Sequence, residues 1–456
     1  MVRAIIIAAL ATASTVFASS APNCTLTQKC PSDTPCCSQY GQCGVGAYCL
    51  GGCDPRMSFG LDSCVAAPVC ESKTYNFNNL DRVMSNTKYL GDSSKTDWVA
   101  DGNPQLYNNN LLLTMAPDSV GTLLASSTYM WYGNVKATFK SSRGQGVVTA
   151  FILLSDVKDE IDFEFVGADL KEAQTNYYFQ GIPQYTHGAN ISLSDTFNNY
   201  HTYEIDWTPD QITWKVDSQE GRTLKRADTW NASTNQYMYP QTPARVQLSL
   251  WPGGLASNGQ GTVDWAGGLV DWNAADIKNN GYYYATFQSV TVDCFNATSA
   301  PGTNDETSYT YNSIAGTNDT VIDGKNSTII KSLIGTGTDP DAGAASGSGS
   351  SSSATASATA ETVPGRSGGN TGSDNHDGDS SSSSAVSAST ATISTDASAS
   401  TSTGSSNGQF SQGGGSSSSS SSSSKSGADK LGATQEKVLK GSVFAVIIAV
   451  VAMMAL

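Results

Sequence analysis

Asp159-Glu160-Ile161-Asp162-Phe163-Glu164-Phe165 alternates acidic and apolar side chains. Successive side chains of a β-strand point to opposite faces, so this stretch predicts a strand with one apolar face and one acidic face. The apolar face suits a packed core. The acidic face carries Glu160, Asp162 and Glu164. Like charges side by side on a strand repel each other, so the pattern calls for a specific reason.

Glycosidic bond cleavage gives the acidic face such a reason. In retaining glycosidases one carboxylate attacks the sugar, and a carboxyl group roughly 5–5.5 Å away protonates the leaving oxygen. The Cα atoms of Glu160 and Glu164 would be roughly 13 Å apart on a strand, but both side chains are long enough to lean together over Asp162. The alternative is an acidic strand that merely faces solvent.

Composition limits the classes of partner and cofactor. The 456 residues carry a net charge of −15, which argues against nucleic acid as a partner. The chain has only 3 His, and no His/Cys cluster has the spacing of metal ligands, so we expect neither a metal nor another cofactor.

Both ends of the chain predict export to the cell surface. Residues 1–21 have the basic start, apolar run and small residues of a signal peptide. Residues 428–456 combine small residues, a polar spacer and an apolar tail, which predicts a GPI-anchor signal that is removed on maturation; a tail-anchored helix is the alternative. We expect a secreted protein, lipid-anchored at the plasma membrane or in the cell wall.

Residues 299–427 predict a glycosylated linker, because from about Thr336 onward the chain is almost entirely Ser, Gly, Ala, Thr and Asp. Asn-x-Ser/Thr sequons, which accept N-linked glycans, occur at Asn190, Asn231, Asn296, Asn318 and Asn326.

Residues 22–70 predict a small module held by disulfides, since so short a segment cannot bury a core of its own. It contains Cys24, Cys30, Cys36, Cys37, Cys43, Cys49, Cys53, Cys64 and Cys70. The remaining cysteine is Cys294, and a bond from Cys70 to Cys294 would tie together the ends of the region between them.

Residues 71–298 read as many short strands separated by turns, with no long amphipathic helix. Expected strands cover 146–154, 200–207, 212–216, 245–251 and 282–294. This spacing predicts an all-β fold, an antiparallel sandwich.

The module resembles the hevein-type chitin-binding modules (carbohydrate-binding module family 18) in the run Cys36-Cys37-Ser38-Gln39-Tyr40-Gly41-Gln42-Cys43-Gly44 and in Tyr48-Cys49. The resemblance implies that Ser38, Tyr40 and Tyr48 bind N-acetylglucosamine, with Gln42 replacing the family's middle aromatic residue. It also implies the pairs Cys24–Cys37, Cys30–Cys43 and Cys36–Cys49, which leaves Cys53 and Cys64 to pair. The alternative is a module that only spaces or stabilises the protein.

The acidic strand resembles the catalytic strand of glycoside hydrolase family 16, whose fold is a β-jelly roll. Together with Gln247-Leu248-Ser249-Leu250-Trp251-Pro252-Gly253-Gly254 and Asn198-Asn199-Tyr200-His201-Thr202-Tyr203, it is similar to the fungal Crh-type cell-wall transglycosylases. That resemblance implies Glu160 as nucleophile and Glu164 as general acid/base, and places Gln247, Trp251 and Thr262 at sugar positions. Asp162 is expected to tune Glu160. We expect Trp207, Trp214 and Trp265 in the core.

The resemblance implies a retaining enzyme that cleaves chitin and transfers the chain to β-glucan or chitin, cross-linking a fungal wall. Its partners would be these polysaccharides, and we expect a monomer. Two alternatives stay open: a hydrolytic endo-β-glucanase or chitinase, and a non-catalytic wall lectin.

Overall fold

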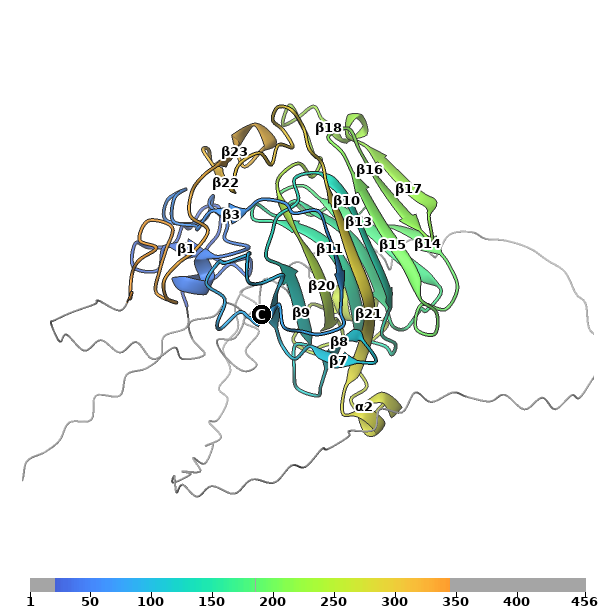
Figure 1. Ribbon diagram of the computed structural model, residues 1–456. Helices are drawn as coiled ribbons and strands as arrows, with labels where there is room; N and C mark the ends of the chain where they lie inside the picture. The colour runs from blue at the N-terminus through green and yellow to red at the C-terminus, as the bar shows by residue number, and fades with distance from the viewer. Residues whose placement is uncertain (1–20, 185, 345–456) are drawn as a thin grey trace, which may run out of the picture.

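Two eight-stranded sheets pack face to face in the computed structural model, which describes residues 21–184 and 186–344 (Figure 1). The predicted all-β jelly-roll sandwich is confirmed. Strand pairs are antiparallel apart from β5–β6, and the helices of the described residues are short. The sheet that contains the acidic strand runs in the order β14 (Ala189–Ser192), β13 (Glu172–Tyr178), β12 (Glu160–Val166), β11 (Val147–Ser155), β20 (Ala244–Pro252), β9 (Thr122–Ser126), β6 (Trp98–Asp101), β5 (Val83–Ser85).

The second sheet covers the apolar face of the first. Its order is β17 (Gln219–Lys225), β16 (Gln211–Val216), β15 (His201–Trp207), β10 (Gly133–Lys140), β21 (Tyr283–Cys294), β8 (Asn110–Met115), β7 (Gln105–Tyr107), with β4 (Lys73–Asn76) also paired to β21. The smaller elements of the sandwich are η2 (Arg226–Thr229), β18 (Trp230–Asn231), β19 (Gln236–Tyr237), α1 (Gln260–Trp265) and α2 (Ala275–Asn280).

The apolar side chains of β12 anchor the acidic strand in the core between the sheets. Ile161, Phe163 and Phe165 are each at most 1% exposed. The Phe165 ring meets the rings of Phe139 and Tyr203 at centroid distances of 5.2 and 4.6 Å. Burial of each such side chain contributes roughly 1.5–3 kcal/mol, so the register of β12 is strongly fixed.

The disulfides include the three pairs that the resemblance implied, the pair of the two cysteines left over, and the separately predicted bond from Cys70 to Cys294. They join Cys24–Cys37, Cys30–Cys43, Cys36–Cys49, Cys53–Cys64 and Cys70–Cys294. Within the module they hold β1 (Cys36–Cys37), β2 (Cys43–Gly44) and η1 (Gly46–Cys49). The bond from Cys70 to Cys294 ties the first strands of the sandwich to the end of β21.

Residues 299–344 are folded, so this part of the predicted linker is wrong. β22 (Ser308–Tyr311) pairs with β23 (Val321–Gly324) and with β3 (Ala67–Pro68), and η3 (Asn318–Thr320) leads into β23. Tyr309, Val321 and Ile330 are 5% exposed or less. Composition missed this segment because its few apolar residues are buried against surfaces of the sandwich and the module rather than in a core of their own.

The predicted signal peptide, the rest of the linker and the GPI-anchor signal lie outside the described residues, apart from residue 21. Among the residues that the structure describes, no helix has the length and apolar character needed to span a membrane.

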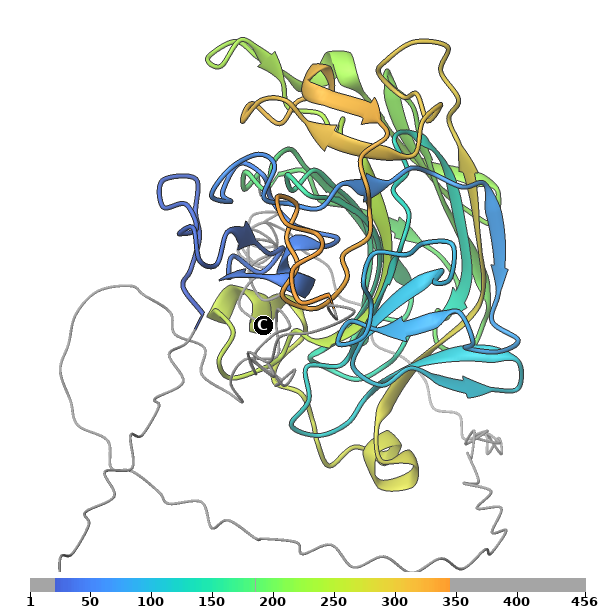
Figure 2. The same ribbon diagram turned by 60° about the vertical axis from the view of Figure 1, so that its left-hand side comes forward.

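The module lies against the sandwich (Figure 2). Segment 325–344, the last that the structure describes, runs across the module, and the amide of Gly46 donates to the carbonyl of Gly335 at 2.8 Å. Ile330 packs in one apolar cluster with Tyr48, Leu50 and Tyr89. This segment therefore acts as a strap that binds the module to the sandwich.

Candidate active site

The acidic face of β12 points away from the core, and we call this side of the sheet the outer face. Glu160, Asp162 and Glu164 pair in register with Leu154, Ile152 and Ala150 of β11 on one side and with Tyr178, Asn176 and Gln174 of β13 on the other. From the second sheet, the indole N–H of Trp214 donates to the backbone carbonyl of Asp162 at 3.0 Å. The apolar side chains and the backbone of β12 are thus fixed by the core, and they fix the positions of the three carboxylates.

Burial and mutual repulsion separate the protonation states of the three carboxylates. Burial raises the pKa of Glu160 to about 7, although a hydrogen bond from Asp162 and the nearby charge of Lys158 work in the opposite direction. Burial, together with the charge of Glu160, raises the pKa of Glu164 to about 8. Burial and the charges of Glu160 and Glu164 raise the pKa of Asp162 well above its ordinary value. Of the two glutamates, Glu160 therefore ionises more readily.

This order matches the division of labour that a retaining mechanism needs. An ionised Glu160 is a nucleophile, and a protonated Glu164 is an acid. A protonated Asp162 donates a hydrogen bond to Glu160 and so favours its charged form.

Asp159, the residue before this cluster, has a different environment. It is 1% exposed, and its carboxylate accepts hydrogen bonds from the amides of Gln180, Gln241 and Thr242 and from the Thr242 hydroxyl, at 2.7–3.1 Å. Asp159 therefore joins three loops of the sandwich and is a structural group.

The outer face contains several buried polar atoms that have no hydrogen-bond partner within the described part of the chain. They are Glu160 Oε2, Asp162 Oδ1, Gln247 Oε1, Ser249 Oγ and Trp251 Nε1, joined by Thr262 Oγ1 on α1. Buried polar groups are almost always paired, and leaving one unpaired costs roughly 1–3 kcal/mol. A cluster of them is typical of a surface that pairs with a ligand.

Two of the three sugar-site candidates from the sequence lie on the outer face of the sheet that carries the carboxylates. Gln247 and Trp251 belong to β20, where Gln247 pairs with Ile152, the β11 residue opposite Asp162. Thr262 is fully buried on α1.

Trp265, also on α1, is only partly buried, so its expected place in the core is wrong. Its ring stacks on Trp251 at a centroid distance of 6.0 Å, and its N–H donates to Gln174 Oε1 at 2.7 Å. Trp207 and Trp214 lie in the core as expected.

Sequence reasoning missed several neighbours of the carboxylates. Gln174, Asn176 and Tyr178 enter the site only through the register of β13. Lys158 is 3% exposed, and its ammonium donates to the carbonyl of Gln39 in the module at 2.6 Å. The alternation of β13 (Glu172–Tyr178) was the one signal that could have indicated a second polar strand beside β12.

The module's candidate residues occupy two different environments. Tyr48 is 2% exposed and packs with Leu50 and Ile330, so it does not present an open ring. Ser38 and Tyr40 line a pocket between the module and the outer face of the sheet.

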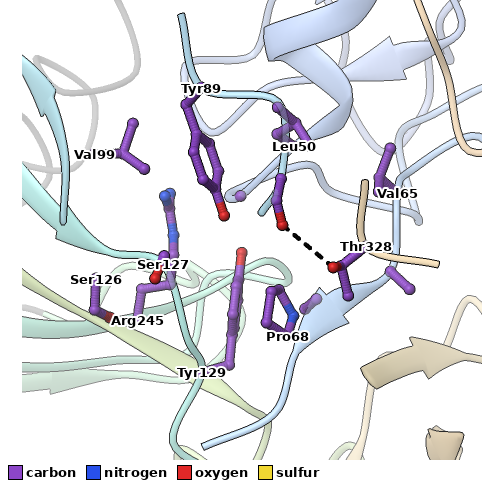
Figure 3. Close-up of a pocket in the computed structure, with 14 residues that line it drawn as sticks. Leu50, Val65, Pro68, Tyr89, Val99, Ser126, Ser127, Tyr129, Arg245 and Thr328 are labelled. Atoms are coloured by element: carbon purple, nitrogen blue, oxygen red, sulfur yellow. Dashed lines mark hydrogen bonds between the residues drawn. The ribbon is translucent and has the colours of Figure 1, made fainter. Parts of the chain in front are cut away.

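A second, smaller pocket marks the seam between the module, the sandwich and the strap (Figure 3). Tyr89, Tyr129 and Arg245 of the sandwich point into this seam, and Leu50 of the module and Thr328 of the strap close it. The amide of Gly52 donates to both Tyr129 Oη and Asp156 Oδ1 at 2.9 Å. The seam is thus built from buried polar contacts as well as apolar ones.

Comparison with known proteins identifies the relatives of this chain. It is 66% identical over 454 residues to Crh-like protein 3 of Botryotinia fuckeliana, an alignment that spans 100% of this chain and 99% of that protein. The chain belongs to the Crh-like proteins. Crh-like protein 2 of Aspergillus fumigatus is 55% identical over 73% of this chain and 76% of its own length.

Residues 92–267 of this Crh-like chain match the model of glycosyl hydrolases family 16. A solved structure described as Crh5 transglycosylase in complex with NAG aligns with 57% of this chain and 95% of its own, at 29% identity and a TM-score of 0.47.

Proposed function

We propose that this protein is a retaining cell-wall transglycosylase that cleaves chitin and joins the chain to a β-glucan or chitin acceptor. The observation that carries the proposal is the row Glu160, Asp162 and Glu164 on the outer face of β12, surrounded by unpaired polar atoms. Membership of the Crh-like proteins supports it. The same carboxylates argue against a purely binding role.

The first step forms a bond between the Glu160 carboxylate and the anomeric carbon of the donor sugar. The glycosidic C–O bond breaks, and its oxygen takes the proton of Glu164. In the second step Glu164, now ionised, takes the proton of an acceptor hydroxyl. The acceptor oxygen bonds to the anomeric carbon and the ester to Glu160 breaks, which restores both groups. A sugar hydroxyl as acceptor gives transfer, and water gives hydrolysis.

The test uses polymeric chitin as donor with fluorescent chito- and laminari-oligosaccharides as acceptors. Transfer places the label in the polymer, whereas release of short sugars without a labelled polymer would show a hydrolase. Glu160→Gln is the control and should lose the labelled product. A labelled product that persists in Glu160→Gln at the wild-type rate contradicts the assignment of the nucleophile.

The location of the enzyme is part of this proposal. Residues 1–21 would direct secretion, residues 428–456 would be exchanged for a GPI anchor, and the sequons would carry glycans. Mass spectrometry of the mature protein before and after phospholipase and glycosidase treatment tests all three. A mature chain that retains residues 428–456 contradicts the anchor.

A further inference from the structure

The module is fixed on the same face of the sheet that carries the carboxylates. Gln39 of the module accepts hydrogen bonds at its side-chain oxygen from Arg245 at 2.8 Å and from Gln247 at 3.3 Å. Its carbonyl accepts from Lys158, the residue whose charge acts on Glu160. Gln39 is 6% exposed. The module therefore lies within reach of the candidate active site.

A row of residues in register leads from Glu164 towards the module. Glu164 pairs with Ala150, Ala150 with Ser249, Ser249 with Leu123, and Leu123 with Asp101. Residues directly opposite each other in antiparallel strands share a face, so all five side chains lie on the outer face. Four strand spacings of roughly 4.8 Å give the row a length of about 19 Å.

The chemistry of this row suits a sugar chain. Ala150 and Ser249 have small side chains, both are buried, and Ser249 Oγ has no hydrogen-bond partner among the described residues. Trp251 follows Ser249 on the same face of β20 and is stacked with Trp265, while Gln247 precedes it and contacts Gln39. The row thus runs between an aromatic side and an amide side, a combination that binds pyranose rings.

The far end of the row enters the pocket beneath the module. This pocket is a shallow recess that opens to solvent between the module and the sheet. Leu123 and Asp101 line it from the sheet, and Ser38 and Tyr40 line it from the module. Asn86 and Tyr89 line it as well, from the loop after β5.

We propose that the module is the closed end of the substrate path, and that the pocket between Tyr40, Ser38, Asp101 and Leu123 binds the terminal pyranose of a neutral β-linked chain. This inference rests on the proposed function. The number of sugars on the module side of the carboxylates is then limited by the row, and the module works as part of the active site rather than as a separate binding unit.

The first test uses the wild-type chain. Chito- and laminari-oligosaccharide donors of increasing length react with a short labelled acceptor, and mass spectrometry measures both fragments of each donor. A closed path sets a maximum size for one fragment, which stops growing while the other lengthens with the donor. Growth of both fragments with donor length overturns the proposal. The series that shows the limit identifies the chain whose end is bound.

The second test fills the pocket. Leu123→Trp should shorten the limiting fragment, whereas Leu106→Trp on β7 of the other sheet, where the side chain is 44% exposed, is the matched control and should match wild type. The same fragment limit in both variants overturns the proposal. Should Leu123→Trp fail to give a wild-type unfolding transition, Tyr40→Ala replaces it and should raise KM for the longest donors about tenfold.

A protein without activity on any donor would refute the proposed function and still leave the path testable. Binding of the same oligosaccharides to the full wild-type chain, measured by calorimetry, should strengthen with length only up to the length that fills the row, and Leu123→Trp should weaken it. An affinity that changes neither with oligosaccharide length nor with Leu123→Trp would contradict the proposed substrate path.

Discussion

The seam beneath the module and the outer face of β12 both contain buried charged groups, but the carboxylates of the seam are hydrogen-bonded to groups around them, whereas Glu160 and Asp162 are hydrogen-bonded to each other and keep unpaired oxygens. Lys158 donates to Gln39, Asp156 accepts from Tyr129 and Gly52, and Asp54 pairs with Arg56 at 2.7 Å. A few residues away, Glu160 and Asp162 each keep one buried oxygen that has no hydrogen-bond partner among the described residues. Paired groups hold a structure together, whereas unpaired ones are held ready for a ligand.

The contrast between paired and unpaired carboxylates is clearest for the adjacent residues Asp159 and Glu160. It gives the prediction with the largest expected effect. Glu160→Gln removes the nucleophile and should lower the transfer rate by at least about 10³-fold. Asp159→Asn changes the adjacent residue by the same chemistry and should keep the wild-type rate at temperatures below its unfolding transition. Initial rates with one donor and one acceptor decide it. Equal losses in both variants would mean that Asp159 and Glu160 do not differ in role.

For the free energy of unfolding we expect the opposite result: a substitution at Asp159 should matter more than one in the acidic row. Asp159→Ala leaves the amides of Gln180, Gln241 and Thr242 without their acceptor, so it should cost roughly 3 kcal/mol and lower the unfolding midpoint by several degrees at pH 7. Glu164→Gln loses activity but should unfold no earlier than wild type, because at pH 7 Glu164 is mostly protonated and the amide replaces a neutral carboxyl group of nearly the same shape. Calorimetry of the two variants measures both effects. An early transition in Glu164→Gln would show that this carboxylate has a structural partner.

The sequence predicted the parts of this comparison that depend on local pattern. The alternation of β12 and of the hairpin from Tyr203 to Val216 indicated which side chains face the core. It could not show that Gln39, far away in the chain, meets Arg245 and Gln247, because that contact depends on how the module sits on the sheet.

The misses have physical causes. Residues 299–344 look like linker because their composition is polar, yet Ile330 and Tyr309 suffice to fasten them to existing surfaces. Trp265 looks like a core residue by type, but the short helix α1 places it against Trp251 and Gln174. The row from Glu164 to Asp101 joins strands far apart in sequence, and only the register of the sheet reveals it.

Substitutions at Asp162 test whether its hydrogen bond sets the pKa of Glu160. Its hydrogen bond lowers the pKa of Glu160, which otherwise rises with burial, so removing the donor should move the acidic limb of kcat/KM to higher pH. Asp162→Ala should show this displacement, and a limb displaced by one pH unit lowers the rate at a fixed acidic pH about tenfold. Asp162→Asn keeps an N–H donor and should retain most of the wild-type profile. Identical profiles for the two variants would remove Asp162 from this role.

The smallest expected effect concerns stability against pH. The pKa of Glu164 is raised from 4.5 to about 8 in the folded protein, so the folded state holds a proton that the unfolded chain has lost. Its contribution to stability is therefore complete below pH 4.5 and is lost as the pH rises through about 8. Glu164→Gln cannot lose a proton, so its stability should match that of wild type at pH 4 and exceed it at pH 8.5.

Denaturant unfolding of both proteins at the two pH values measures this difference, and Asp159→Asn serves as a carboxylate control at the same values. A gap between wild type and Glu164→Gln that is as large at pH 4 as at pH 8.5 would mean that the amide changes packing rather than charge. A gap that is absent at pH 4 and has opened by pH 8.5 ties the cost to the proton that Glu164 keeps in the folded protein. The charge that the enzyme must avoid for stability would then be the one that it forms transiently in each turnover, when Glu164 has given up its proton and waits for the acceptor hydroxyl.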